Sequence, residues 1–187
     1  DAGQRRSRAL DWCRNLRCNI VLFDYCGFGV ASGRSSSSSA CWDLQRVVEW
    51  VEDRPWCHGR SGLVLFGEGI GSGPCLWLAS TRPLRGMVLL GAPESALSGI
   101  VATPLASCAD AYPNRVRAAR VRCPVLIAHS QGDPWTPFRH GRRLAECLRT
   151  KAWSEPFFPS GPFRSVDIPD AMRDRFLRRI RGFLTSL

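Results

Sequence analysis

Four short and almost uninterrupted apolar runs constrain the fold of this chain more than any other feature. They lie at residues 18–25, 62–66, 86–92 and 123–129, and they are rich in Val, Leu, Ile and Phe. Strands with one face in water alternate apolar and polar residues, whereas strands covered on both faces read as continuous apolar runs. We therefore expect an α/β fold with a mostly parallel sheet flanked by helices, in a single domain spanning residues 1–187.

The stretches between these runs have the apolar spacing of helices. Helices are expected after Gly71, where Leu76 and Ala79 point inward, and at residues 138–149 and 171–184. A further helix, at residues 43–53, has an apolar face formed by Leu44, Val47, Val48 and Val51.

A run of serines at residues 35–39 precedes the helix predicted at residues 43–53. Low-complexity serine is typical of a flexible loop. Serine is also a favoured N-cap, because its hydroxyl accepts a hydrogen bond from a free backbone N–H of the first helical turn. We therefore expect a flexible loop that supplies the N-cap of this helix.

The charge of the chain is strongly positive. It has 26 basic and 16 acidic residues, a formal net charge of +10, and the last predicted helix carries five arginines opposite its apolar stripe. The stripe consists of Met172, Phe176, Ile180 and Phe183 or Leu184. Such a face fits an anionic membrane surface, or it is the solvated side of a helix packed on the sheet. Nucleic acid is not an expected partner, since the basic residues lack interleaved aromatics and a groove-reading helix signature.

The nine cysteines form neither a metal-binding nor a disulfide pattern. They are scattered, odd in number and without a Cys-x-x-Cys pair. A reducing compartment is the default for such a chain, so we expect a cytoplasmic location, with no cofactor and no metal. No apolar run approaches the roughly 20 residues that span a bilayer.

The stretch VLFGEGIGSGP, residues 64–74, ends a predicted strand and begins a predicted helix. Parallel α/β sheets bind ligands at the carboxyl ends of their strands, so this turn is a candidate site. A strand, a glycine-flanked turn and a helix usually present a nucleophile on a strained elbow. The middle of this turn is Gly69, which fits a strained backbone but offers no reactive atom.

Four motifs in this order resemble one family. They are FDYCGFGVASGRSS (23–36), VLFGEGIGSGP (64–74), DAYPNRVRAARVRCPVLIAHSQGD (110–133) and FRHGRRLAECL (138–148). Together they resemble the α/β-hydrolase fold and, more narrowly, the abhydrolase-domain serine hydrolases that remove palmitate from proteins. Residues 1–4 resemble the stretch just after that family's His-Gly-Asn oxyanion loop. The resemblance therefore implies an α/β-hydrolase fold that lacks its N-terminal strands.

The resemblance also assigns catalytic positions. The nucleophile position holds Gly69, and the acid position holds Asp133, whose alternative role is to cap a turn or a helix. The base belongs in the loop at residues 158–170, which contains no histidine. Ser72, one helical turn after Gly69, and Glu68 are weak candidates for a replacement nucleophile.

Two functions compete on this basis. The leading hypothesis is a catalytically inactive relative of the depalmitoylases, with a binding or scaffolding role at the former active-site edge. The alternative is an active thioesterase or esterase with relocated residues, for instance Ser72, His129 and Asp133, while His58 and His140 are interpreted as structural. The resemblance implies acylated proteins or an anionic membrane surface as partners, and a location at the cytoplasmic face of membranes.

Overall fold

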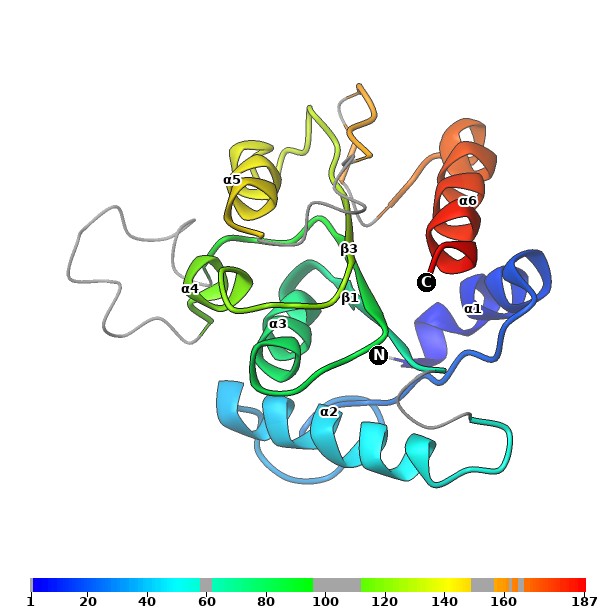
Figure 1. Ribbon diagram of the computed structural model, residues 1–187, viewed down its shortest axis with the longest axis vertical. Helices are drawn as coiled ribbons and strands as arrows, with labels where there is room; N and C mark the ends of the chain where they lie inside the picture. Colours follow the sequence, from blue (N-terminus) through cyan, green and yellow to red (C-terminus); the bar gives the residue numbers. More distant parts are fainter. Residues whose placement is uncertain (1, 58–61, 96–111, 149–156, 162, 165–166) are drawn as a thin grey trace.

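A computed structural model describes residues 2–57, 62–95, 112–148, 157–161, 163–164 and 167–187 (Figure 1). Three strands form its sheet: β1 (Val64–Glu68), β2 (Gly86–Leu90) and β3 (Val125–Ala128), in the order β1-β2-β3. Both pairings are parallel, with Val64 opposite Gly86 and Met87 opposite Val125. An isolated parallel bridge joins Ala128 to Phe157 beyond β3. The predicted parallel sheet is therefore confirmed for three of the four apolar runs.

The fourth run, at residues 18–25, is not a strand, and this prediction was wrong. The segment runs without a ladder partner among the described residues, and Val21 and Leu22 are 40% and 43% exposed. Phe23 and Tyr25 instead pack against the core. An apolar run indicates that a segment contacts the core. Forming a strand also requires a neighbouring backbone that pairs with the segment in register.

Six α-helices are assigned within the described residues. They are α1 (Ala2–Leu16), α2 (Ser37–Glu52), α3 (Ser72–Thr81), α4 (Asn114–Ala118), α5 (Arg139–Cys147) and α6 (Asp170–Thr185). Helices α2, α3, α5 and α6 match the predicted ones, whereas α1 and α4 were not predicted. Within the described part of the chain, no helix combines the length and the apolar character needed to cross a membrane.

The serine run forms the start of α2. The Ser36 hydroxyl accepts a hydrogen bond from the Ser39 backbone N–H at 2.9 Å, and the Ser39 hydroxyl accepts one from the Ser36 N–H at 2.9 Å. This reciprocal pair is a capping box, so the predicted N-cap is confirmed. The expectation of a flexible loop was wrong for residues 37–39, which form the first helical turn because the cap satisfies its free donors.

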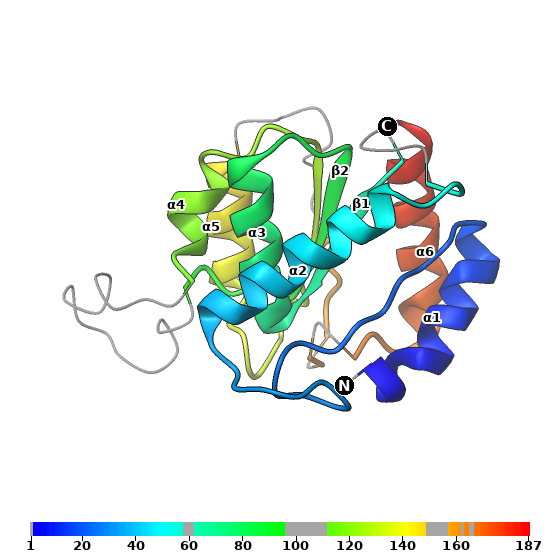
Figure 2. The ribbon, with the colours of Figure 1, turned by 90° about the horizontal axis from the view of Figure 1, so that it is seen from below.

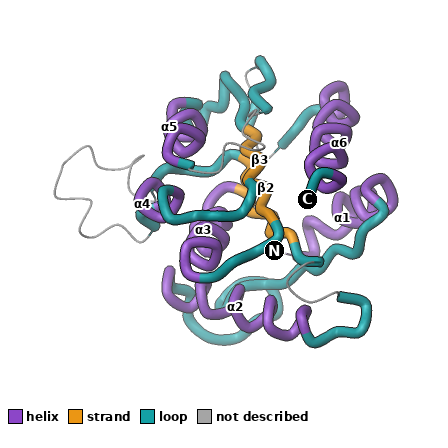
Figure 3. Tube along the Cα trace, in the orientation of Figure 1, coloured by secondary structure: helices purple, strands orange, loops and turns teal. Residues whose placement is uncertain are grey.

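The helices cover the sheet on both faces (Figures 1 and 2). Figure 3 shows the strands running between the two helical layers. Helices α2 to α5 enclose one core with Leu65, Met87 and Leu89 of the sheet. Helices α1 and α6 enclose the other core with sheet residues of opposite parity, such as Val88 and Leu126. This alternation follows from the two-residue period of a strand, which sends successive side chains to opposite faces.

The apolar face of α6 explains its position on the sheet. Phe176, Ile180 and Phe183 are at most 3% exposed, as the spacing predicted, while Met172 and Leu184 are partly buried. Full burial of such a side chain contributes about 1.5–3 kcal/mol. Helix α1 adds Trp12, whose ring contacts Phe176 edge-on with centroids 5.7 Å apart.

Candidate active-site elbow

The turn after β1 has the backbone of a nucleophile elbow. The strand ends at Glu68, a short 3₁₀ turn covers Gly69–Gly71, and α3 begins at Ser72. Gly69 has φ +54°, in the left-handed region where a side chain is strained. The tip of the elbow thus has a conformation that would strain any side chain, and its glycine carries none that could supply a reactive atom.

The two flanking glycines have different roles. A Cβ on Gly67 would lie 2.8 Å from the Cα of Ser72, so the absence of a side chain lets the start of α3 approach the strand. Gly71 has φ −63° and ψ −14°, and a Cβ there would meet only the Tyr25 hydroxyl, at 3.9 Å. Gly67 is therefore required by packing, and Gly71 is not required by packing or by backbone conformation.

Ser72 lies at the first position of α3 and is fully buried. Its hydroxyl donates a hydrogen bond to the carbonyl oxygen of Gly69. The contact closes the elbow on itself and directs the hydroxyl inward, in a geometry that stabilises the turn.

Glu68, the residue before the tip, turns toward helix α1. Its carboxylate pairs with the guanidinium groups of Arg5, at 2.7 Å, and Arg8, and its side chain is 18% exposed. These ion pairs tie the end of β1 to α1.

Asp133 lies in the loop that follows β3. Its Oδ1 accepts hydrogen bonds from the backbone N–H groups of Trp135 and Thr136, both at 2.9 Å. Asp133 thus caps the turn that leads toward α5, one of the two roles that its sequence position leaves open. Its carboxylate also acts on His129, whose pKa it raises against the larger effect of burial.

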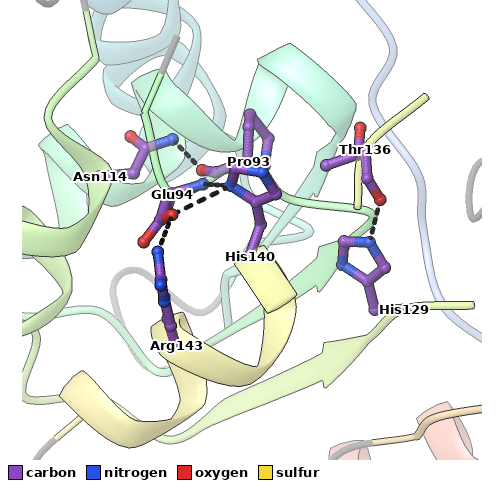
Figure 4. Close-up of polar contacts among 7 residues, drawn as sticks. All are labelled: Pro93, Glu94, Asn114, His129, Thr136, His140 and Arg143. Carbon is purple, nitrogen blue, oxygen red and sulfur yellow. Dashed lines mark hydrogen bonds and ion pairs between the residues drawn. The ribbon is translucent and has the colours of Figure 1, made fainter. Parts of the chain in front are cut away.

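His129 is buried at the end of β3 (Figure 4). Its Nε2 lies 2.8 Å from the carbonyl oxygen of Thr136, and because a carbonyl only accepts, Nε2 carries the proton. Its Nδ1 has no hydrogen-bond partner among the described residues, and a Cβ on Gly141 would lie 2.5 Å from that nitrogen. Burial lowers the pKa of His129, against opposing effects of the Thr136 carbonyl and the Asp133 carboxylate, and so favours the neutral ring. Within the described residues, no hydrogen bond joins His129 to Ser72.

A second polar cluster lies at the carboxyl end of β2 (Figure 4). His140 Nδ1 accepts a hydrogen bond from the Glu94 backbone N–H at 3.4 Å and lies 3.4 Å from Glu94 Oε1. Arg143 Nη1 donates to the same carboxylate oxygen at 2.8 Å, and Asn114 Nδ2 donates to the Pro93 carbonyl at 2.8 Å. Burial lowers the pKa of His140, and the Glu94 carboxylate opposes that effect. The cluster joins α4 and α5 to the loop after β2.

Sequence reasoning did not identify this cluster. Glu94 follows one apolar run, Asn114 follows a proline, and His140 begins a predicted helix. Each residue is ordinary in its own segment, and only the fold brings them together. The resemblance to the family's helix start at His140 was the one available signal.

The loop at residues 158–170, to which the resemblance assigns the base, lies beside the turn formed by Asp133. Ser130 Oγ donates to the Gly161 carbonyl at 2.8 Å, and the Arg164 guanidinium lies 4.4 Å from the centroid of the Trp135 ring. The described residues of this loop include Phe163 and Arg164, whereas positions 162 and 165–166 lie outside them. The fold therefore brings together the two loops to which the resemblance assigns the acid and the base, and positions 158–170 contain no histidine.

The described residues contain no group of three or more His, Cys, Asp or Glu side chains placed to hold a metal ion. Eight cysteines in this part of the chain are free thiols, and Cys108 lies outside it. The predicted position of His58 also lies outside the described residues.

Sequence comparison connects the chain to α/β hydrolase domain-containing proteins. It is 28% identical over 186 residues to alpha/beta hydrolase domain-containing protein aho-3 of Caenorhabditis elegans, covering 98% of this chain and 54% of that protein. It is 29% identical over 189 residues to alpha/beta hydrolase domain-containing protein 17C of Homo sapiens, covering 99% and 55%. The chain thus spans about half the length of these relatives. No protein-family model matches it.

Solved structures share the fold at lower identity. A monoacylglycerol lipase from Paleococcus ferrophilus superposes with a TM-score of 0.73 at 19% identity, covering 100% of this chain and 90% of the lipase chain. The Pyrococcus furiosus esterase Pf2001 gives a TM-score of 0.71 at 13% identity, covering 95% and 74%. At these identities the likeness concerns the fold, which is that of the α/β hydrolases.

Proposed function

We propose that this chain, which has the α/β-hydrolase fold and is related to alpha/beta hydrolase domain-containing proteins, is a catalytically inactive member of that group with a binding role. The observation that carries the proposal is Gly69 at φ +54°. The elbow has the left-handed backbone conformation that presents a nucleophile in this fold, and its residue has no nucleophilic atom.

The missing base supports the same conclusion. A serine hydrolase needs a base that hydrogen-bonds both the nucleophile and the acid. His129 is engaged with Thr136, His140 is engaged with Glu94, and residues 158–170 contain no histidine. In serine hydrolases, loss of the nucleophile or of the base lowers kcat by roughly a millionfold, and loss of both costs little more. Turnover through the ordinary triad is therefore not expected.

The proposed ligand is an acylated protein segment, the substrate class of the depalmitoylases that the loop motifs resemble. Exposed apolar side chains at the carboxyl edge of the sheet support this choice. Ile70 on the elbow is 59% exposed, and Phe28 and Val30, on the loop after Tyr25, are 54% and 99% exposed. Gly71 faces the Tyr25 hydroxyl, which places the elbow next to this loop. An acyl chain gains binding free energy from such surface because contact removes both apolar surfaces from water.

The decisive experiment measures catalysis and binding in the same preparation. The protein is incubated with a fluorophosphonate probe and, separately, with a palmitoyl-thioester peptide whose hydrolysis and fluorescence anisotropy are both followed. We expect no stoichiometric labelling, no hydrolysis above buffer, and saturable binding of the acylated peptide but not of its unacylated control. The Ile70→Ser variant should weaken binding, whereas Val116→Ser, exposed on α4, serves as the matched control.

The same assay tests the alternative of a relocated triad. If the wild type is labelled and hydrolyses thioester, and if Ser72→Ala abolishes both signals while Asp133→Asn reduces turnover, the chain is an active hydrolase and the inactive assignment is wrong. If the chain neither hydrolyses nor binds the acylated peptide, the proposed ligand is wrong.

A further inference from the structure

Helices α1 and α6 lie side by side on one face of the sheet (Figures 1 and 2). Arg173 of α6 pairs with Asp11 of α1 at 2.5 Å, and Arg181 donates a hydrogen bond to the Asn15 carbonyl. Both helices bury their apolar sides toward the sheet. Their exposed side chains therefore point away from it, on the same side of the molecule.

This two-helix layer holds most of the net positive charge of the chain. Helices α1 and α6, with Arg17, contain ten arginines and three aspartates, which is +7 of the formal net charge of +10. The arginines are Arg5, Arg6, Arg8, Arg14, Arg17, Arg173, Arg175, Arg178, Arg179 and Arg181, and the aspartates are Asp11, Asp170 and Asp174. The sequence drew attention to α6 alone, and the fold adds α1 beside it.

Not all of these arginines are available to a partner. Arg5 and Arg8 turn inward to Glu68, and Arg173 is paired with Asp11. Arg181 is exposed but donates to the Asn15 carbonyl. The other exposed arginines define what we call the arginine face: Arg6, Arg14, Arg17, Arg175 and Arg178, of which Arg175 also lies 5.6 Å from the centroid of the Phe157 ring. Among the described residues, no carboxylate lies within ion-pair distance of any of these five.

The composition of the face favours one class of partner. Clustered like charges that form no ion pairs repel one another, and an external anionic surface relieves that repulsion. Leu10 lies among the α1 arginines and is 50% exposed, an apolar side chain that can enter the boundary of a bilayer. The exposed aromatic residues of the described chain, by contrast, lie outside α1 and α6, so the face lacks the stacking platform that single-stranded nucleic acid requires.

We propose that the arginine face docks on the anionic surface of a lipid bilayer. The arginines supply the attraction to acidic headgroups, and Leu10 contacts the acyl boundary. Binding of this kind weakens with salt, because mobile ions screen exposed charges over about 10 Å at 0.1 M ionic strength. This interaction does not depend on the catalytic state of the elbow, so its test is separate from that of the proposed function.

The test is vesicle flotation with phosphatidylcholine alone and with added phosphatidylserine. We expect the wild type to float only with the anionic vesicles and to be released by salt. Replacing Arg14, Arg17, Arg175 and Arg178 together with Gln should lower the partition coefficient by about 600-fold, since each arginine near such a surface contributes about fivefold.

A matched control variant tests whether vesicle binding depends on the position of the arginines or only on the net charge of the chain. Replacing Arg46, Arg115, Arg120 and Arg122 with Gln also lowers the formal net charge from +10 to +6, but on exposed positions of the opposite layer and its connections. It should keep binding within about tenfold of the wild type, because charges beyond a Debye length from the bilayer are screened. A variant with Lys in place of Arg14, Arg17, Arg175 and Arg178 should also bind, because it keeps the positive charge of the face.

Three results would overturn the proposal. They are equal loss in the two Gln variants, equal flotation with and without anionic lipid, and absence of flotation by the wild type. A parallel gel-shift assay with RNA and with duplex DNA tests nucleic acid as the competing partner. Binding of nucleic acid without flotation on vesicles would also reject the bilayer proposal. Circular dichroism melts of all variants verify that each is folded.

Discussion

Replacing each of the three glycines of the elbow with alanine should change the stability of the protein in a different way. We consider Gly67→Ala, Gly69→Ala and Gly71→Ala, each of which adds a single methyl group to the same turn. At Gly67 the new Cβ would lie 2.8 Å from the Cα of Ser72 and 3.2 Å from the Leu89 Cδ2 atom. At Gly69 the new side chain would be strained by the left-handed backbone at φ +54°. At Gly71 the new Cβ would have no close contact and the backbone has an ordinary helical φ.

The magnitudes follow from these geometries. Overpacking against a backbone atom costs about 1–3 kcal/mol, so Gly67→Ala is expected to lower the free energy of unfolding by that amount. An L-residue in the left-handed region costs about 1–2 kcal/mol, which gives the expected loss for Gly69→Ala. Gly71→Ala restricts the unfolded chain without strain in the fold, so it should stabilise by about 0.4–1 kcal/mol.

Chemical denaturation of the wild type and the three variants measures these differences. For a chain of this length, 1 kcal/mol corresponds to a change in Tm of about 2–4 °C, so thermal melts give a second reading. The order of stability should be Gly71→Ala above the wild type, and the wild type above the other two. If Gly71→Ala is the most damaging, or if all three lose stability equally, the described geometry of the elbow is incorrect.

Three further effects on stability are expected. Burial lowers the pKa of His129 and His140 from the ordinary value of 6.5, so the unfolded chain binds protons that the folded chain excludes. Melts at a series of pH values should therefore show stability that is fully present above pH 6.5 and falls as the pH drops below it. The fall should be shallower in a variant that carries both His129→Asn and His140→Gln. Ser36→Ala removes the N-cap of α2 and should cost about 1 kcal/mol in chemical denaturation, whereas Ser38→Ala, in the first turn of the helix, should cost less. Phe183→Ala should cost about 3–5 kcal/mol because Phe183 is fully buried, and an unchanged denaturation midpoint would contradict the packing of α6.

The sequence predicts those elements whose apolar pattern has one reading. Helix α6 was predicted because Phe176, Ile180 and Phe183 recur at helical spacing, and all three are buried. Helix α1 was missed because Trp12 is its only buried residue, which leaves no apolar stripe for periodicity to detect. The run at residues 18–25 was assigned to the sheet because local composition cannot show whether a neighbouring strand is available to pair with it.

The candidate site also has a part that the local sequence predicts and a part that only the fold brings together. The elbow is a local feature, so its strand, its strained tip and its helix could all be predicted from residues 64–74. The cluster of Glu94 with His140 and Arg143 joins segments more than 40 residues apart, and no local pattern connects them. The catalytic assignments of Ser72 and Asp133 remain predictions, since a buried hydroxyl and a capping carboxylate are compatible with structural roles.

The persistence of the elbow without a nucleophile has a physical reason. Its backbone is held by the close approach of α3 at Gly67, by the Ser72 hydroxyl on the Gly69 carbonyl, and by the ion pairs of Glu68 with α1. None of these interactions uses a side chain at position 69. Glycine moreover adopts φ +54° at lower cost than serine would. Under the proposed inactive assignment, the backbone of the turn therefore persists without a nucleophile, because interactions outside position 69 hold it in place.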